Sequence, residues 1–162
     1  MKYKDGVYTH STLEEGCDFY ITDRFKKKYH FKIASFLLGD LLASEAIEVV
    51  EGKKGREPYI FNKLFKFDVD EEYAEMLLKA KIKKGINKRY LQTSDGNLHI
   101  GDNNVVSGRI DYLEDFEGSM LSTQFVIDGK RITIEKFVEM LDPYQSFNFK
   151  FEIFDPSDDI PD

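Results

Sequence analysis

The chain has 162 residues, of which 41% are hydrophobic and 14% aromatic, and 23 Lys and Arg against 30 Asp and Glu give a net charge of −7. This length fits one compact domain or two small subdomains, and the apolar content excludes a largely disordered chain. The single cysteine, Cys17, excludes an intrachain disulfide and an intrachain cysteine zinc site, so we expect a reducing, cytoplasmic setting.

The N-terminal residues lack the apolar core of a secretory signal. The longest apolar stretch, residues 36–43, is interrupted by Gly39 and Asp40 and falls far short of the ~20 residues that a membrane span requires. We therefore expect a soluble protein without membrane contact.

The first half of the chain is predicted to be mainly strands. Residues 1–16 contain two turn-like Asp-Gly and Glu-Gly pairs and are expected to be loosely ordered. Residues 44–51 combine helix-forming Ala and Glu with β-branched residues, and we favour a strand because a hairpin-like Gly52–Gly55 loop follows. The strands expected in this half are 17–21, 29–38, 44–51 and 58–67.

A long helix is predicted over residues 69 to about 90. The sequence Asp68-Val69-Asp70-Glu71 is typical of a capped helix start, and the basic residues near the other end complement the helix dipole. The expected apolar stripe consists of Tyr73, Met76, Leu77 and Ala80. Gly85 costs about 1 kcal/mol relative to Ala inside a helix, so the helix either passes through it or ends there.

Residues 92–104 are rich in Gly, Asp and Asn and enclose only a short strand at 98–100. We expect a single α+β domain over 1–162 whose polar loop 92–104 allows a subdivision into 17–91 and 105–155. A strand over 105–113 and an acidic loop over 114–119 are predicted to follow. The tail, 156–162, is expected to be loosely ordered like residues 1–16.

The C-terminal region has the most regular pattern. Asp128-Gly129 predicts a tight hairpin after residues 125–127, because both positions tolerate positive φ. Thr133 is expected to cap a short helix that ends at Asp142-Pro143, with an apolar stripe of Ile134, Phe137, Val138 and Leu141. The alternation in 147–154 predicts a strand whose aromatic face is covered by this helix. The fold class is therefore α+β, with mostly antiparallel sheet, one long central helix and one short C-terminal helix.

Four segments in and before this region form a recognisable signature: Gly108-Arg109-Ile110, Val126-Ile127-Asp128-Gly129-Lys130, Glu135-x-Phe137-x-x-Met140-Leu141 and Phe147-x-Phe149-Lys150-x-Glu152-Ile153. This signature resembles the C-terminal part of an uncharacterised bacterial family of domains of unknown function, and the similarity extends over about 29–155. The family has Gly where this chain has Val138 and Ser146, and Trp where it has Ile134. Its relatives carry a cysteine-rich metal segment that Cys17 alone cannot reproduce. The resemblance implies a reproducible fold and gives no information about an activity.

No motif of nucleophilic catalysis is present, although Cys17 could meet His30 or His10 in space. Gly52–Gly55 lacks the spacing of a phosphate-binding loop. We therefore expect no cofactor and no metal, and we lean towards a protein that is not an enzyme. An alternative is a metal- or small-molecule-dependent enzyme with a dispersed site, for which the candidates are His99, Asp102, Asp111 and Glu114.

Charge is distributed unevenly along the chain. Residues 1–91 carry 18 Lys and Arg against 15 Asp and Glu, a balance of +3, whereas 92–162 carry 5 against 15, a balance of −10. We interpret the acidic half as a contact surface for a basic protein partner, as in small acidic immunity proteins that block basic toxins. The candidate acidic contact residues are Asp111, Glu114, Asp115 and Glu117. Neither this group nor the acidic tail matches an EF-hand loop.

A basic and aromatic stretch at 24–32 gives a further alternative, nucleic-acid binding. Its basic residues are Arg24, Lys26, Lys27 and Lys28, but Phe31 fits an inward-facing strand position. We therefore regard a non-enzymatic protein-interaction module, regulatory or immunity-like, as the better hypothesis. Nucleic acid is not the partner that we expect, and the oligomeric state is left open.

Overall fold

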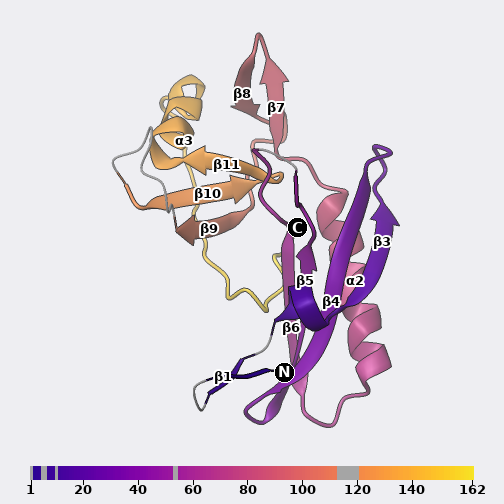
Figure 1. Ribbon diagram of the computed structural model, residues 1–162. Helices are drawn as coiled ribbons and strands as arrows, with labels where there is room; N and C mark the ends of the chain where they lie inside the picture. Colours follow the sequence, from indigo (N-terminus) through magenta and orange to yellow (C-terminus); the bar gives the residue numbers. More distant parts are fainter. Residues whose placement is uncertain (1, 5–6, 10, 53–54, 113–120) are drawn as a thin grey trace. The chain divides into compact units, whose positions relative to one another are not determined.

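The computed structural model describes residues 2–4, 7–9, 11–52, 55–112 and 121–162 (Figure 1). The chain forms two compact units, where the sequence favoured one domain with a subdivision near 92–104. The first unit comprises residues 1–51, 58–87 and 152–162, and the second comprises 52–57 and 88–151. Antiparallel sheets, one long helix and one short C-terminal helix confirm the predicted α+β class.

The first unit is a four-stranded antiparallel sheet in the order β3-β4-β5-β6, with helix α2 packed on one face (Figure 1). The strands expected at 17–21 and 29–38 are confirmed. The hairpin expected after them is confirmed too, although β5 begins at Leu41, directly after the Gly39-Asp40 turn. The elements are β1 (Lys2–Lys4), β2 (Val7–Thr9), α1 (Thr12–Glu15), β3 (Cys17–Thr22), β4 (Lys28–Leu38), β5 (Leu41–Glu48), β6 (Ile60–Lys66) and α2 (Glu71–Ile86).

The core of this unit lies between the sheet and α2. Every second residue of β4 points towards the helix, so Tyr29, Phe31 and Ile33 are buried, and the register aligns Ile33 with Ala46 and Ala46 with Phe61. Aromatic rings also meet across the intervening strand β5, for example Phe31 of β4 and Phe61 of β6, whose ring centroids lie 6.0 Å apart. Edge-to-face aromatic pairs of this kind stabilise a core beyond simple burial.

Helix α2 is confirmed but begins at Glu71, two residues later than predicted, because Asp70 is its cap and its carboxylate accepts a hydrogen bond from the backbone of Glu72. The predicted apolar stripe is wrong, since Tyr73 and Met76 are exposed and Ala80 is also on the solvent side. The buried face instead follows i, i+4 spacing. It consists of Ala74, Leu78, Ile82 and Ile86.

Gly85 does not end α2, which continues to Ile86. A Cβ at this position would lie 2.5 Å from Cε1 of Phe61, closer than real contacts allow. The glycine therefore lets the end of the helix approach the aromatic core, and this packing explains why a poor helix former stands there. None of the helices in the described parts of the chain is long and apolar enough to cross a membrane.

The N-terminal residues that the structure describes contain regular elements, which the sequence did not predict. Strands β1 and β2 pair, and α1 is attached to β5 by a 2.6 Å hydrogen bond from Thr12 Oγ1 to Glu45 Oε1. Gly16 lies against the backbone of Ile33, where a side chain would not fit. The contacts of Thr12 and Gly16 are long-range and leave no periodic signal in the sequence.

The tail also has defined partners within the first unit, contrary to the expectation of loose order. The ammonium group of Lys81 donates 2.8 Å hydrogen bonds to the carbonyls of Asn62 and Asp158, and Lys63 forms a 3.1 Å ion pair with Asp159. Burial is the largest influence on the pKa of Lys81 and lowers it, whereas the hydrogen bond from Lys63 lowers the pKa of Asp159. The edge strand β6 is therefore covered by a lysine and an acidic tail rather than by another strand.

The second unit contains a hairpin, β7-β8, and a three-stranded antiparallel sheet in the order β11-β10-β9. The predicted Asp128-Gly129 turn is confirmed, with φ values of 53° and 71°, and Thr133 caps α3 by accepting a hydrogen bond from the backbone of Lys136. The elements are β7 (Leu91–Ser94), β8 (Asn97–Ile100), β9 (Arg109–Tyr112), β10 (Thr123–Ile127), β11 (Lys130–Thr133), α3 (Ile134–Met140) and the 3₁₀ helix η1 (Asp142–Tyr144).

Several predictions about this unit need correction. Residues 92–104 are not a polar boundary, because Asp95-Gly96 is the turn of the β7-β8 hairpin. The strand expected at 105–113 is confirmed only from Arg109 to Tyr112. In α3, Val138 and Leu141 are exposed and Met140 is buried instead, so the predicted stripe is partly wrong. The acidic loop predicted at 114–119 lies outside the described residues.

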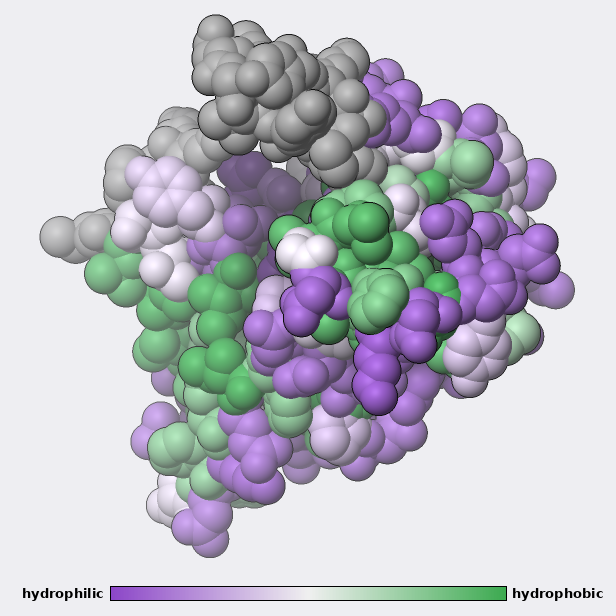
Figure 2. Space-filling view, turned by 90° about the horizontal axis from the view of Figure 1, so that it is seen from below, coloured by the Kyte–Doolittle hydropathy of each residue, from purple (hydrophilic) through white to green (hydrophobic). Residues whose placement is uncertain are grey.

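The largest error concerns residues 147–154, which belong to none of the strands and are not covered by α3. Their side chains Phe147, Phe149, Phe151 and Ile153 are 64%, 91%, 61% and 72% exposed. The alternation is present, but the described chain provides no neighbouring strand to pair with it. Hydrophobic residues are also exposed among hydrophilic ones in the view from below (Figure 2).

Candidate functional site

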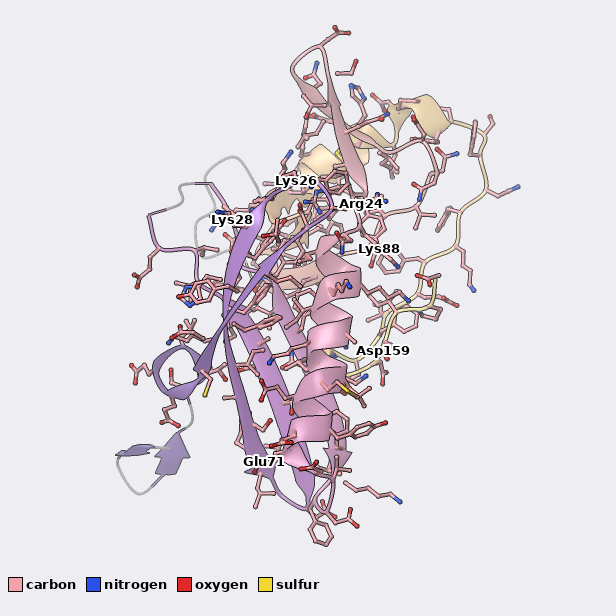
Figure 3. All side chains as sticks on the ribbon, turned by 90° about the vertical axis from the view of Figure 1, so that its right-hand side faces the viewer. Arg24, Lys26, Lys28, Glu71, Lys88 and Asp159 are labelled. Atoms are coloured by element: carbon pink, nitrogen blue, oxygen red, sulfur yellow. The ribbon has the colours of Figure 1, made fainter. Side chains whose placement is uncertain are left out.

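The basic residues predicted at 24–28 lie on the turn between β3 and β4, which we call the basic turn: Arg24, Lys26, Lys27 and Lys28, all exposed. Buried Asp23 shapes this turn, since its carboxylate accepts hydrogen bonds from the backbone of Phe25 and Lys27 and from the hydroxyl of Tyr29. The amide of Arg24 donates a 2.7 Å hydrogen bond to Oδ1 of Asn87 at the end of α2. Figure 3 shows Arg24, Lys26 and Lys28 in this part of the first unit. The turn is therefore a fixed, positively charged structure.

The aromatic residues near the basic turn are less suited to stacking on nucleic-acid bases than the sequence indicated. Tyr29 and Phe31 are buried in the core, as expected for Phe31, and cannot stack on bases. His30 is already stacked on Tyr20 with ring centroids 4.4 Å apart, and its Nε2 lies 2.6 Å from the Asp18 carboxylate. Phe25 is the exposed aromatic residue of the basic turn, and the Arg24 guanidinium lies over it.

The carboxylate of Asp18 contacts both a lysine and a histidine on the outer face of β3 and β4. Its carboxylate pairs with Lys32 at 2.8 Å as well as with His30. The hydrogen bond from Lys32 is the largest cause that lowers the pKa of Asp18, and the bond from His30 adds to it. His30 contacts Asp18 and not Cys17, so the structure does not form the Cys17–His30 pair that the sequence allowed. The alternative partner, His10, lies outside the described residues.

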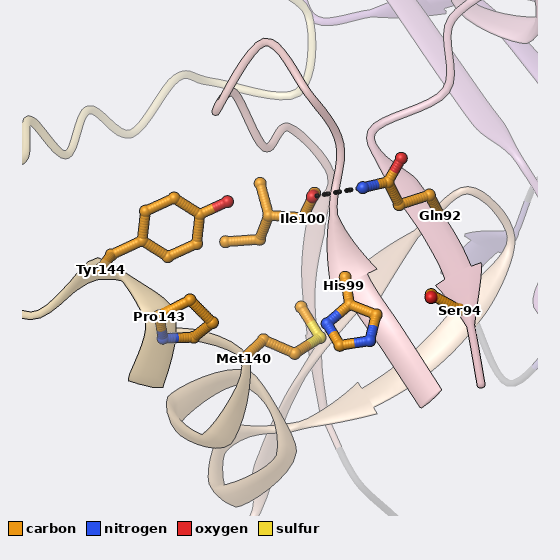
Figure 4. Close-up of a pocket in the computed structure, with 7 residues that line it drawn as sticks. All are labelled: Gln92, Ser94, His99, Ile100, Met140, Pro143 and Tyr144. Carbon is orange, nitrogen blue, oxygen red and sulfur yellow. Dashed lines mark hydrogen bonds between the residues drawn. The ribbon is translucent and has the colours of Figure 1, made fainter. Parts of the chain in front are cut away.

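A hollow in the second unit has a volume of about 290 Å³ and lies between the β7-β8 hairpin and the end of α3 (Figure 4). Gln92 donates a 3.3 Å hydrogen bond to Asp102 and a 3.5 Å bond to the Ile100 carbonyl at its edge. Its lining residues are Gln92, Ser94, His99, Ile100, Met140, Pro143 and Tyr144.

This hollow contains a hydroxyl and an imidazole, but not the geometry of a nucleophile with its base. No hydrogen bond joins Ser94 to His99 in the described chain, and no acidic group there orients the His99 ring. Catalysis of the serine type needs both contacts. The hollow therefore supports at most the binding of a small group.

The proposed metal ligands do not form a site in the described residues. His99 and Asp102 lie at and after the end of β8, whereas Asp111 lies on β9, and Glu114 is outside the described residues. No group of three His, Cys, Asp or Glu side chains that could hold an ion occurs in the parts of the chain that the structure describes.

Of the acidic contact residues, only Asp111 can be placed, because Glu114, Asp115 and Glu117 lie outside the described residues. Asp111 forms a 3.2 Å ion pair with Arg109 on the same strand. Strand β9 is the edge of its sheet in the described chain, and its hydrophobic residues Ile110 and Tyr112 are 49% and 63% exposed. An edge strand with exposed apolar side chains was not predicted, since its exposure depends on the order of strands in the sheet.

Two family models match the chain, one over each part. Residues 15–87 match a domain of unknown function (DUF7686), and residues 90–158 match another domain of unknown function (DUF7713). The boundary between the matches coincides with the end of α2, where the two units divide after Asn87. Comparison with curated proteins and with solved structures gave no match. The expected resemblance to an uncharacterised family is thus confirmed, and the chain is similar to two such families, one matching residues 15–87 and the other residues 90–158.

Proposed function

We propose that the protein is a non-enzymatic interaction module that binds a basic protein partner through its acidic C-terminal half. The observation that carries this proposal is the edge strand β9, whose Ile110 and Tyr112 are exposed next to the acidic residues that follow it. An edge strand offers backbone groups to a partner strand, and its alternate side chains provide apolar contact.

The charge of this half supports the choice of partner. Residues 92–162 have a balance of −10, which attracts a basic surface and accelerates encounter with it. Asp111 is paired with Arg109, so the acidic residues beyond β9 would supply most of the attraction. The role would be regulatory or immunity-like, and we place it in the cytoplasm because of the single cysteine.

An enzymatic role has less support. The hollow beside His99 lacks an oriented base, and the candidate metal ligands that can be placed belong to different elements. The basic turn also receives no support as a nucleic-acid surface, since most of its neighbouring aromatic rings are buried or already stacked.

The proposal is tested by capture of protein partners from native lysate at low and high salt, with Tyr112→Lys as the variant. Tyr20→Lys is the matched control, because Tyr20 is a similarly exposed tyrosine on β3, an edge strand of the four-stranded sheet in the first unit. We expect a basic partner that is retained at low salt, released at high salt, lost with Tyr112→Lys and kept with Tyr20→Lys. Recovery of no protein, or of an acidic one, or equal recovery with both variants, would refute the proposal.

A further inference from the structure

Residues 147–153 have the alternating sequence of a β-strand but pair with no strand in the described chain, and their apolar side chains are exposed. The four apolar side chains at alternate positions are between 61% and 91% exposed. Phe149, Phe151 and Ile153 make no backbone hydrogen bond within the described chain. Alternating apolar side chains, and backbone groups without a partner in the described chain at these three residues, are properties that a pairing strand requires.

Local contacts mark where this segment begins and ends. At its start, the amide of Phe147 donates a 2.9 Å hydrogen bond to the carbonyl of Tyr144, and the two rings pack edge to face. Immediately after it, the carboxylate of Asp155 accepts hydrogen bonds from the amide and hydroxyl of Ser157.

We propose that this segment pairs with the same segment of a second copy of the chain, antiparallel and centred on Phe151. This inference goes beyond the proposed function and does not depend on it, because it uses another surface. In this register Phe151 faces Phe151 and Phe149 faces Ile153, so the apolar residues of both copies share one face of the ribbon. Such aromatic and aliphatic cross-strand pairs are favourable.

Charge selects this register. With Phe151 at the centre, Lys150 of each copy lies opposite Glu152 of the other, at positions where antiparallel strands bring side chains closest. Moving the centre to Lys150 would place two lysines opposite each other, and moving it to Glu152 would place two glutamates together. The twofold symmetry of a homodimer requires such self-complementarity, and the sequence FKFEI provides it.

The backbone agrees with the same register. When Phe151 is a hydrogen-bonded pair, the bonds of the ladder use Phe149, Phe151 and Ile153. These are the residues whose backbone groups make no such bond in the described chain. The pairing therefore supplies partners to backbone groups that face water in a single copy.

The test exchanges these charges in the full chain and measures self-association by sedimentation velocity over a concentration series. The ionic strength is about 0.15 M, at which interactions between exposed charges more than ~8 Å apart are largely screened. Lys150→Glu places glutamates opposite each other and Glu152→Lys places lysines opposite each other. We expect each single variant to weaken dimerisation about tenfold or more. The double variant K150E/E152K restores it, because opposite charges face each other again.

A mixture of the two single variants gives the decisive result. A copy with K150E and a copy with E152K are complementary only to each other, so the mixture should form a heterodimer although neither variant dimerises well alone. Unchanged circular dichroism and melting temperature would show that these exposed substitutions leave the fold intact. A monomeric wild type, a dimer that ignores the charge exchanges, or failure of the mixture to associate would overturn the proposal.

Discussion

Two segments of this chain have nearly the same alternation of apolar and polar residues, but the apolar side chains of one are buried and those of the other are exposed. In β4, Tyr29, Phe31 and Ile33 alternate with polar residues and are almost completely buried. In 147–153, Phe147 to Ile153 alternate in the same way and stay on the surface. The difference is what surrounds them: β4 pairs with β3 and β5 and is covered by α2, whereas 147–153 has no strand beside it in the described chain. Alternation thus indicates a capacity to pair, and only the neighbours decide whether pairing occurs within one copy.

The first prediction tests this contrast directly. Phe31→Ala should lower the free energy of unfolding by about 3–5 kcal/mol, because it opens a cavity in the core between β4 and α2. Phe149→Ala, which removes the same ring from an exposed position, should change it by less than about 0.5 kcal/mol. Urea denaturation of a dilute sample measures both. Similar losses for the two variants would show that 149 is packed and that the contrast is wrong.

The second prediction concerns the turn that starts β4. Asp23→Ala should cost about 2–3 kcal/mol, since buried backbone and hydroxyl donors lose their acceptor. Asp40→Ala, in the exposed turn that ends β4, is the control and should cost less than about 0.5 kcal/mol. Equal thermal stability of the two variants would argue against a structural role of Asp23.

The third prediction concerns the helix that covers β4. Gly85→Ala should destabilise the protein by about 1–2 kcal/mol, although Ala is the better helix former, because its methyl group meets the Phe61 ring. In a Phe61→Leu background the sign should reverse, as the smaller side chain leaves space for the methyl group. A double-mutant cycle measures the coupling. Stabilisation by Gly85→Ala in the wild-type background would contradict the close approach.

The smallest effect is expected at the acidic tail that covers β6. Asp159→Asn should cost about 0.5–1 kcal/mol at neutral pH, because it removes the ion pairs with Lys63 and Lys81 at an exposed site. The folded state lowers the pKa of Asp159, so its contribution is present above the unfolded value near 3.8 and is lost as the pH falls below it. The two proteins should therefore converge in stability in acid. A constant difference down to the lowest pH would contradict this account.

Elements with a local signal could be predicted from the sequence. The Asp128-Gly129 turn, the Thr133 cap and strand β4 follow from turn chemistry, capping and alternation, and all three are present. The incorrect predictions concern features that depend on residues distant in the sequence. The exposed side of α2 depends on where the sheet lies, and the isolation of 147–153 depends on strand order, which no local pattern contains. Of the predicted acidic contact residues, only Asp111 lies in the described part of the chain. The exposure of β9 could not be predicted, because it depends on the order of strands in the sheet.

The carboxylate of Asp128 also accepts hydrogen bonds from the backbone of Tyr90 and Leu91, 38 and 37 residues earlier in the chain. A hairpin closed by a two-residue turn forms within about 1–10 μs from local contacts alone. Asp128 therefore reaches its position in the turn without help from distant residues and can then accept the hydrogen bonds of the earlier segment. We expect this turn to guide the order of assembly in the second unit, so that a slow turn would delay the whole unit.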